Sequence, residues 1–294
     1  MKFSIVALAA LSQIASAHYF FPTVDDSTEF QYIRDFTRPT KYNPIKFSSN
    51  PAGDIRDNSF VDGEDIICNQ GGSKSGANTQ VKEVKGGDVL TFKLGVGAKM
   101  GHPGPTLAYM SDAKGDVKSY DGKGDWFKIM EEGVCNASGD FTKGAWCNYD
   151  SPSFQVKIPR DVPNGEYLLR VEHIGVHRSH VNQPEHYVSC AQVKVTGGGS
   201  GKVDAEMVKF PGAYKSTDPY ANFSIYNGAK AFPMPGPKVW GGATKAGGST
   251  GGNTGGNTGS NTSAPAGGNT QAPSAGAGNG AGAGNGGNTE ACLL

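Results

Sequence analysis

The residue of this chain best suited to chemistry is His18, because of the sequence that precedes it. Residues 1–17 read as a secretory signal peptide, with Lys2 near the start, an apolar stretch, and the cleavage motif Ala-Ser-Ala at residues 15–17. Cleavage after this motif would give His18 a free α-amine beside its imidazole, which together form a bidentate nitrogen chelate. Several nitrogens in one plane suit Cu(II) better than other common ions. The sequence therefore predicts a copper site at the mature N-terminus.

A second candidate ligand, His102, lies in the sequence Gly-His-Pro-Gly-Pro at residues 101–105. Prolines and glycines on both sides predict a rigid, exposed loop, which is a poor place for a core histidine. Such a loop suits a metal ligand, because fixed geometry makes a metal site selective. A histidine on an ordinary surface turn is the alternative that the motif alone leaves open.

The third group of polar residues is His177 with Glu185, His186 and Tyr187. Alternation along a strand places Glu185 and Tyr187 on one face and His186 on the other. A phenol oxygen, a carboxylate and the imidazole of His177 would then form a polar pocket beside a metal, with Tyr187 as a weak axial ligand and His177 and Glu185 as hydrogen-bonding groups. Ordinary strand packing is the alternative for Tyr187. We interpret His173 and His186 as structural.

Short runs in which apolar and polar residues alternate surround these residues and predict β-strands. The clearest lie at residues 81–84, 89–94, 154–158, 167–174 and 187–195. No stretch shows a sustained helical period of apolar residues, so helices should be few and short. Many short strands, Gly/Pro turns and long loops predict an all-β protein, an antiparallel β-sandwich.

Composition divides the chain into three parts. After the signal peptide at residues 1–17, residues 18–240 contain every remaining aromatic residue and predict one folded domain. Residues 241–294 are rich in Gly, Asn, Thr and Ser and predict a disordered tail without a recognisable binding module. The net charge of zero gives no indication of nucleic-acid or membrane-surface binding. The signal peptide is too short to span a bilayer, so we expect a secreted, soluble monomer.

Secretion makes the cysteines and the glycosylation motifs informative. Cys135 and Cys147 enclose a short loop, which favours a local disulfide, and Cys68 and Cys190 would then link an early strand to a late one. The sequence alone does not determine this connectivity, and Cys292 is left over. N-glycosylation motifs begin at Asn136, Asn222 and Asn261.

Several motifs follow one another in a characteristic order. They are His-Tyr at residues 18–19, Gly-His-Pro-Gly-Pro at 101–105, Asp-Gly-Lys-Gly-Asp-Trp-Phe-Lys-Ile at 121–129, Gly-Glu-Tyr-Leu-Leu-Arg-Val-Glu at 165–172, Tyr-Val-Ser-Cys-Ala-Gln at 187–192, Pro-Gly-Ala-Tyr at 211–214 and Asp-Pro at 218–219. Each is modest alone. The ordered set spans roughly residues 18–240 and closely resembles the fungal cellulose-active lytic polysaccharide monooxygenases (auxiliary activity family nine), formerly classed as glycoside hydrolases.

The resemblance implies an immunoglobulin-like or fibronectin-like β-sandwich that binds one copper ion. It implies that His18 contributes its α-amine and imidazole Nδ1, His102 another nitrogen, and Tyr187 an axial oxygen. His177 matches a family histidine that helps to position bound oxygen species. The implied reaction uses O2 or H2O2 and an external electron donor (a small phenol, ascorbate or a secreted dehydrogenase). It would oxidise C1, C4 or both beside the glycosidic bond. The implied substrate is cellulose or a related β-1,4-glucan, hemicelluloses among them.

One residue departs from the family pattern. Members usually carry Gln two residues before the axial Tyr, where this chain has Glu185. An ionised Glu cannot donate a hydrogen bond to a copper-bound oxygen, whereas a protonated Glu could. Glu185 therefore favours an alternative function, a non-catalytic copper- or cell-wall-binding protein on the same scaffold. A hydrolytic glycosidase would need two carboxylates at a defined spacing, and no convincing pair emerges.

The family's flat face implies that exposed aromatic rings bind the polysaccharide, because rings stack on sugar faces. Tyr214 lies in the family's aromatic-contact segment and is the first candidate for this role, with Tyr220 and Tyr19 as further candidates. Trp126 stands beside Phe127 in a strand-like segment, so we expect it in the core.

Overall fold

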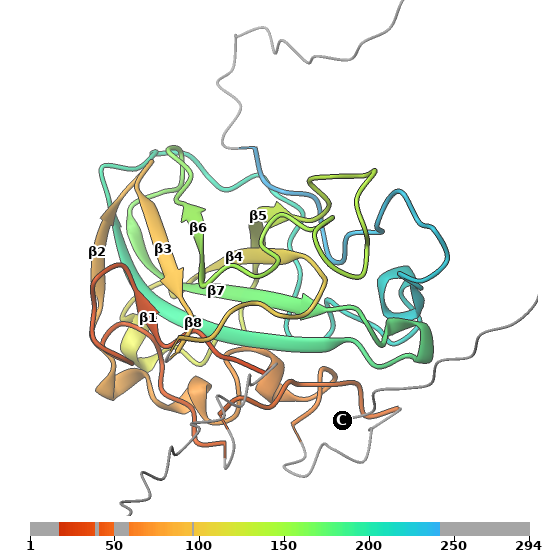
Figure 1. Ribbon diagram of the computed structural model, residues 1–294. Coiled ribbons are helices and arrows are strands. Elements are labelled where there is room, and N and C mark those ends of the chain that lie inside the picture. The colour runs from red at the N-terminus through yellow and green to blue at the C-terminus, as the bar shows by residue number, and fades with distance from the viewer. Residues whose placement is uncertain (1–17, 39–40, 50–58, 96, 242–294) are drawn as a thin grey trace, which may run out of the picture. The chain divides into compact units, whose positions relative to one another are not determined.

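The computed structural model describes residues 18–38, 41–49, 59–95 and 97–241. The predicted signal peptide, the Asn261 motif, Cys292 and nearly all of the predicted tail lie outside these residues. The described part consists of strands and long loops (Figure 1). None of its helices has the length and apolar character that crossing a membrane requires.

Two sheets make up the described domain (Figure 1). The three-stranded sheet has the order β1 (Thr23–Val24), β3 (Val89–Lys93), β6 (Ser153–Lys157). The five-stranded sheet has the order β2 (Lys82–Lys85), β8 (Glu185–Thr196), β7 (Gly165–Gly175), β4 (Thr106–Asp112), β5 (Phe127–Glu132). The predicted β-sandwich is confirmed, with one difference: β2 pairs with β8 in parallel. These two strands are far apart in the sequence, so no hairpin imposes an antiparallel direction on them.

Within the described ranges, helices are limited to short 3-10 turns, as the sequence predicts. The structure has η1 (Glu64–Ile66), η2 (Gly72–Lys74), η3 (Gly76–Asn78), η4 (Val117–Ser119), η5 (Ser179–Val181) and η6 (Pro219–Asn222). They lie in loops rich in Gly, Ser and Asn, residues whose side chains and backbone freedom favour turns over long helices.

The five-stranded sheet is buried on both faces, which explains why its central strands are so apolar. On one face, Val193 belongs to a core that includes Phe92 and Phe154 of the three-stranded sheet. On the other face, Val188 packs in a second core with Trp126 and the long loops. Trp126 has no exposed surface, which confirms its predicted core position.

The hairpin formed by β7 and β8 carries the predicted polar residues at its end. In the register of this hairpin, Gly175 pairs with Glu185 and His173 pairs with Tyr187. Because side chains alternate along a strand, Tyr187 belongs to the core between the sheets, whereas His186 faces the opposite side. The predicted distribution of these residues over the two faces is confirmed.

The loop at residues 101–105 is fixed against the end of β7. The backbone nitrogens of Ile174 and Val176 donate to the carbonyls of Pro105 and Pro103 at 3.0 and 2.8 Å. Gly104, between these prolines, has a φ of 153°, and a Cβ there would lie 1.8 Å from the Ile174 carbonyl oxygen. Only glycine therefore allows this close approach, which holds His102 beside the hairpin.

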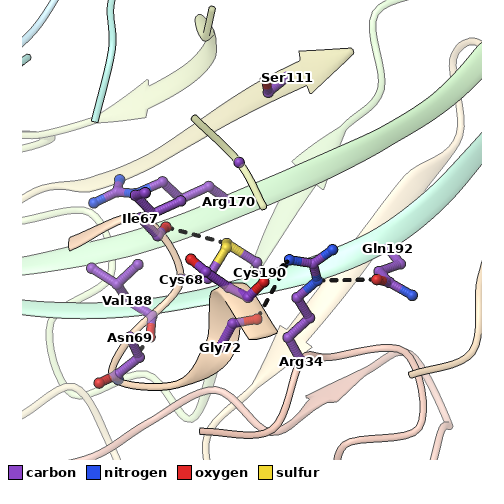
Figure 2. The surroundings of a disulfide bond; sticks show 12 residues. Arg34, Ile67, Cys68, Asn69, Gly72, Ser111, Arg170, Val188, Cys190 and Gln192 are labelled. Carbon is purple, nitrogen blue, oxygen red and sulfur yellow. Dashed lines mark hydrogen bonds between the residues drawn. A yellow bond between two sulfur atoms is a disulfide. The ribbon is translucent and has the colours of Figure 1, made fainter. Parts of the chain in front are cut away.

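Both predicted disulfides are present. Cys68–Cys190 joins residues 122 apart in sequence, and Cys135–Cys147 closes a loop with a separation of 12. Figure 2 shows the first bridge beside Arg34, which donates to Gln192. Cys68 lies in the loop between η1 and η2 rather than on a strand. A disulfide across so long a loop contributes about 5 kcal/mol in a chain-entropy estimate, and here it anchors β8 close to Tyr187.

Candidate metal centre

Three side chains from distant parts of the sequence meet at one end of the hairpin. His18, His102 and Glu185 each offer a ligand atom, and these atoms lie within 4.8 Å of one another. They come from the first described residue, the 101–105 loop and the start of β8. The sequence analysis predicted His18 and His102 as ligands and Glu185 as a hydrogen-bonding group, and the fold brings these three together as a group that could hold a metal ion.

His102 contributes a buried ring nitrogen to this group. Its Nε2 atom is buried and has no hydrogen-bond partner in the described structure. Burial lowers the pKa of His102 to about 4, although the nearby Glu185 carboxylate acts in the opposite direction. The imidazole is therefore neutral near pH 7. A neutral imidazole nitrogen without a partner is the kind of donor that binds copper or zinc.

The rings of His18 and His177 both lie close to the ring of His102. The ring centroids of His18 and His102 are 5.7 Å apart, and the His18 side chain is 35% exposed. The His177 ring stacks on His102 at 4.4 Å, and its buried Nδ1 has no hydrogen-bond partner in the described structure. Burial also lowers the pKa of His177. The predicted proximity of His177 to the ligand group is thus present in the fold.

Glu185 faces this histidine cluster as an ionised carboxylate. Its Oε2 lies 3.5 Å from His102 Nε2 and 3.8 Å from His18 Nε2. Burial acts to raise its pKa, but the surrounding histidines, Lys46 and the Tyr187 hydroxyl hold it at about 2. Of the two protonation states that the sequence left open, the surroundings of Glu185 favour the charged one, which accepts hydrogen bonds and donates none.

The Tyr187 hydroxyl donates to Glu185 Oε2 at 2.7 Å. Its ring is 2% exposed and stacks on Tyr19 with centroids 4.3 Å apart. The Tyr19 hydroxyl in turn lies 2.6 Å from His173 Nδ1. This buried arrangement fits the structural interpretation of His173, and it places the Tyr187 oxygen beside the ligand group.

Lys46 is the residue of this site that the sequence analysis missed. Its side chain has no exposed surface, and its Nζ lies 3.2 Å from Glu185 Oε1. The available signal was a single lysine between Ile45 and Phe47, in an otherwise apolar segment. A charge at such a position requires a buried counter-charge, although sequence alone could not say which one.

The three tyrosines predicted to bind polysaccharide do not have the exposure this requires. Tyr19 is 1% exposed, Tyr214 is 3% and Tyr220 is 1%, so none of the rings presents a face to a sugar. Because all three rings are buried, the prediction that they bind the polysaccharide is wrong. Their hydroxyls allowed them to enter the core, as when Tyr214 donates to Glu172 at 2.6 Å.

An exposed aromatic residue does lie beside the centre. Tyr226 is 57% exposed, and its hydroxyl donates to the backbone carbonyl of His177 at 3.0 Å. The His180 ring packs against it edge-on at 5.2 Å. The sequence signal was the Asn-Gly pair that follows Tyr226, because these turn residues predict an exposed loop.

The two glycosylation motifs in the described residues have different surroundings. Asn136 is exposed and begins a turn in which its side-chain oxygen accepts from Ser138. Asn222 is also exposed, but its amide nitrogen donates to the carbonyls of Ser216 and Asp218 at 2.8 and 3.1 Å. A glycan on Asn222 would replace one of these N–H groups. Modification at both positions stays a prediction.

Comparison with known proteins agrees with this geometry. The family model of Auxiliary Activity family 9 (formerly GH61) matches residues 18–233. The chain belongs to Auxiliary Activity family 9. The match begins at His18 and includes every residue of the centre, so the family resemblance read from the sequence is confirmed.

Curated family 9 relatives cover most of the chain. AA9 family lytic polysaccharide monooxygenase D of Aspergillus tamarii is 52% identical over 248 residues, which cover 83% of this chain and 88% of the relative. AA9 family lytic polysaccharide monooxygenase A of Aspergillus fumigatus is 49% identical and covers 85% and 86%. Membership of family 9 thus assigns the chain to the monooxygenases that cleave polysaccharides oxidatively.

Solved structures of family 9 share the fold. The crystal structure of HiLPMO9B matches with a TM-score of 0.62 and 27% identity, covering 76% of this chain and 100% of that chain. A structure described as a cellulose-active polysaccharide monooxygenase from M. thermophila matches with a TM-score of 0.61 and 27% identity, covering 77% and 100%. These similarities confirm the immunoglobulin-like β-sandwich.

Proposed function

We propose that this protein is a secreted, copper-dependent monooxygenase that cleaves β-1,4-glucan chains with an external electron donor and O2 or H2O2. The observation that carries the proposal is the buried, unpartnered Nε2 of His102, in a group with His18 and Glu185 whose ligand atoms lie within 4.8 Å. Neutral imidazoles suit a copper ion, and family membership makes redox chemistry the expected use of such a site.

The proposed ligands are His18, through its imidazole and the α-amine that cleavage before it would release, and His102, through its unpartnered Nε2. Tyr187 would contribute its phenol oxygen, because its hydroxyl shares Glu185 Oε2 with the histidine cluster. When bound, copper supplies the one-electron redox chemistry that activates O2 or H2O2 for C–H oxidation.

The remaining residues of the centre orient groups and control protons. Glu185 holds the Tyr187 hydroxyl in place by accepting its hydrogen bond. The ring of His177 is held against His102, with its Nε2 3.8 Å from Glu185 Oε1 and its side chain 24% exposed. The partly exposed side chains of His18 and His177 put the proposed ligands within reach of a small oxidant and of substrate.

Tyr226 is the proposed contact to the polysaccharide, in place of the buried tyrosines. Its exposed ring lies one hydrogen bond from His177, so a sugar ring stacked on it would lie near the centre. A β-1,4-glucan offers flat sugar faces for this contact, and the M. thermophila relative is described as cellulose-active.

Mass spectrometry of soluble products tests the proposal. Copper-loaded protein with a processed N-terminus is incubated with amorphous cellulose and ascorbate, with and without EDTA. Aldonic acids would report oxidation at C1, and ketone products would report oxidation at C4; both should disappear with the chelator. Hemicellulose blends, tested in parallel, define the substrate range.

Two other outcomes would contradict parts of the proposal. Bound copper without oxidised products on any β-glucan would favour the non-catalytic copper- or wall-binding alternative. An intact mass that shows a mature chain not beginning at His18 would remove the α-amine from the ligand set.

A further inference from the structure

Lys46 is held in place from both sides of its backbone. Its neighbour Ile45 exchanges two backbone hydrogen bonds with His186, at 2.8 and 2.9 Å. The Lys46 carbonyl accepts from the backbone nitrogen of Val61 at 3.0 Å. The segment is thus tied directly to β8, one residue from Glu185, and the direction of the Lys46 side chain is set by the fold.

The ion pair of Lys46 with Glu185 is buried on both sides. The Lys46 side chain is 0% exposed and that of Glu185 is 3% exposed, with Nζ and Oε1 3.2 Å apart. Burying either charge alone would be strongly unfavourable, so each depends on the other. Together they add no net charge to the histidine cluster.

The two oxygens of Glu185 have different neighbours. Oε1 faces Lys46, with His177 Nε2 farther away at 3.8 Å. Oε2 accepts the Tyr187 hydroxyl and lies 3.5 Å from His102 Nε2. The carboxylate is thus close enough to join the group that could hold a metal, while its other oxygen is held by an ammonium group.

We infer that Lys46 is a positioning residue that holds Glu185 as an outer, charge-compensated partner of the copper site rather than a copper ligand. This inference rests on the proposed copper function. A carboxylate so close to the proposed ligand nitrogens would otherwise bind the ion directly and add a negative charge to it. The Lys46 ammonium group opposes direct binding of Glu185 to the ion, because it attracts Oε1. It also compensates the negative charge of the carboxylate.

The decisive variant is Lys46→Met, which keeps the apolar stem and removes the charge. We expect Cu(II) to bind about 10–100-fold more tightly, the size of effect that partners of metal ligands commonly have. The Cu(II) paramagnetic resonance spectrum should change as an oxygen ligand joins, and the reduction potential should fall. Competition with a chelator of known affinity measures the binding, on protein secreted with a processed N-terminus.

Three further variants separate this role from a merely structural one. Lys46→Met combined with Glu185→Gln should return the affinity and spectrum to within about threefold of the wild type, because the released charge is gone. Lys46→Arg should retain the wild-type spectrum. Lys128→Met is the matched control, since Lys128 is buried but pairs with Glu131 and the Pro235 carbonyl. It should change stability without changing the copper spectrum.

Each result has a definite meaning. If Lys46→Met is less stable but keeps the wild-type affinity, spectrum and potential, the inference is wrong and Lys46 is structural. If Lys46→Met does not fold, Glu185→Gln decides, because the Lys46 cation, no longer facing a carboxylate at position 185, should then weaken Cu(II) binding about tenfold. An unchanged affinity in Glu185→Gln would overturn the inference. Wild-type protein that binds no copper would overturn the proposed function as well.

Discussion

Two buried carboxylates on one hairpin, Glu172 of β7 and Glu185 of β8, have opposite surroundings. Glu172 receives two bonds from Arg170, at 2.8 and 3.1 Å, one from Tyr214 at 2.6 Å, and a contact of 2.8 Å with His186 Nδ1. All of these are within hydrogen-bond distance, so both oxygens of Glu172 are fully engaged.

Among the described residues, Glu185 has shorter polar contacts only to Tyr187 and Lys46, while the histidine nitrogens near it stand at 3.5 to 3.8 Å. One of them, His102 Nε2, has no hydrogen-bond partner in the described structure. The same residue type is therefore part of a closed structural network on one face of the sheet and of an open ligand group on the other. Unmet hydrogen-bonding capacity beside the carboxylate, rather than burial or charge, distinguishes the surroundings of Glu185 from those of Glu172.

The largest effect on stability should come from breaking the hydrogen-bond network around Glu172. Glu172→Gln leaves the Arg170 cation buried without its counter-charge, and we expect a loss of about 3–5 kcal/mol of unfolding free energy. Urea denaturation of the metal-free protein measures this. Glu64→Gln, which disturbs an exposed pair with Lys123, is the control and should cost less than about 1 kcal/mol. Equal effects of the two variants would contradict the structural role of Glu172.

Mutation in the ligand group beside Glu185 should change metal binding rather than stability. His102→Ala removes a proposed ligand, so Cu(II) affinity should fall by at least about 100-fold, beyond what changes in outer partners produce. Unfolding of the metal-free protein should change much less than in Glu172→Gln. His180→Ala, at an exposed histidine of a neighbouring loop, is the matched control. A His102→Ala protein that still binds copper tightly would remove His102 from the ligand set.

Acid should progressively remove the stability that the Glu172 network contributes. Burial raises the pKa of Glu172, but Arg170 and His186 outweigh this and lower it from 4.5 to about 2. The stability that ionised Glu172 contributes is therefore fully present above pH 4.5 and is lost as the pH falls through about 2. The difference in unfolding free energy between wild type and Glu172→Gln should shrink over this range. A constant difference would show that Glu172 does not titrate as the cluster requires.

The smallest expected effect concerns Tyr226, the exposed tyrosine beside the candidate metal centre. Tyr226→Ala should weaken cellulose binding by about 2–10-fold, the contribution of one stacked ring. Tyr226→Phe keeps the ring and loses only the hydrogen bond to His177, so it should bind as the wild type does. Pull-down on microcrystalline cellulose measures both. Equal binding by all three proteins would place the polysaccharide elsewhere.

Sequence reasoning worked where the information is local. The period of two residues along a strand placed Glu185 and Tyr187 on one face and His186 on the other, and the Gly-Pro motif around His102 indicated a fixed loop. The short loop between Cys135 and Cys147 likewise favoured their pairing, whereas Cys68–Cys190 followed only as the remaining pair. The strand faces, the fixed loop and the short disulfide depend on neighbours in the chain, which the sequence displays directly.

It did not work where the deciding partner is remote. Tyr214 became a core residue because Glu172 accepts its hydroxyl, a contact between residues 42 positions apart. Lys46 meets Glu185 across the fold, and that contact also favours the charged form of the carboxylate, which the sequence left open. No periodicity reports such pairs, since tertiary packing alone creates them.

The glycine at position 104 has a consequence for how the protein comes apart. Because its backbone rests directly on the Ile174 carbonyl, the loop that carries His102 has no room to slide over the hairpin that carries Glu185. Loop and hairpin therefore belong to one cooperative unit rather than to a locally fraying segment. On heating, the loop and the hairpin should therefore melt in one transition, so that the arrangement of His102 and Glu185 is lost only when the hairpin itself unfolds.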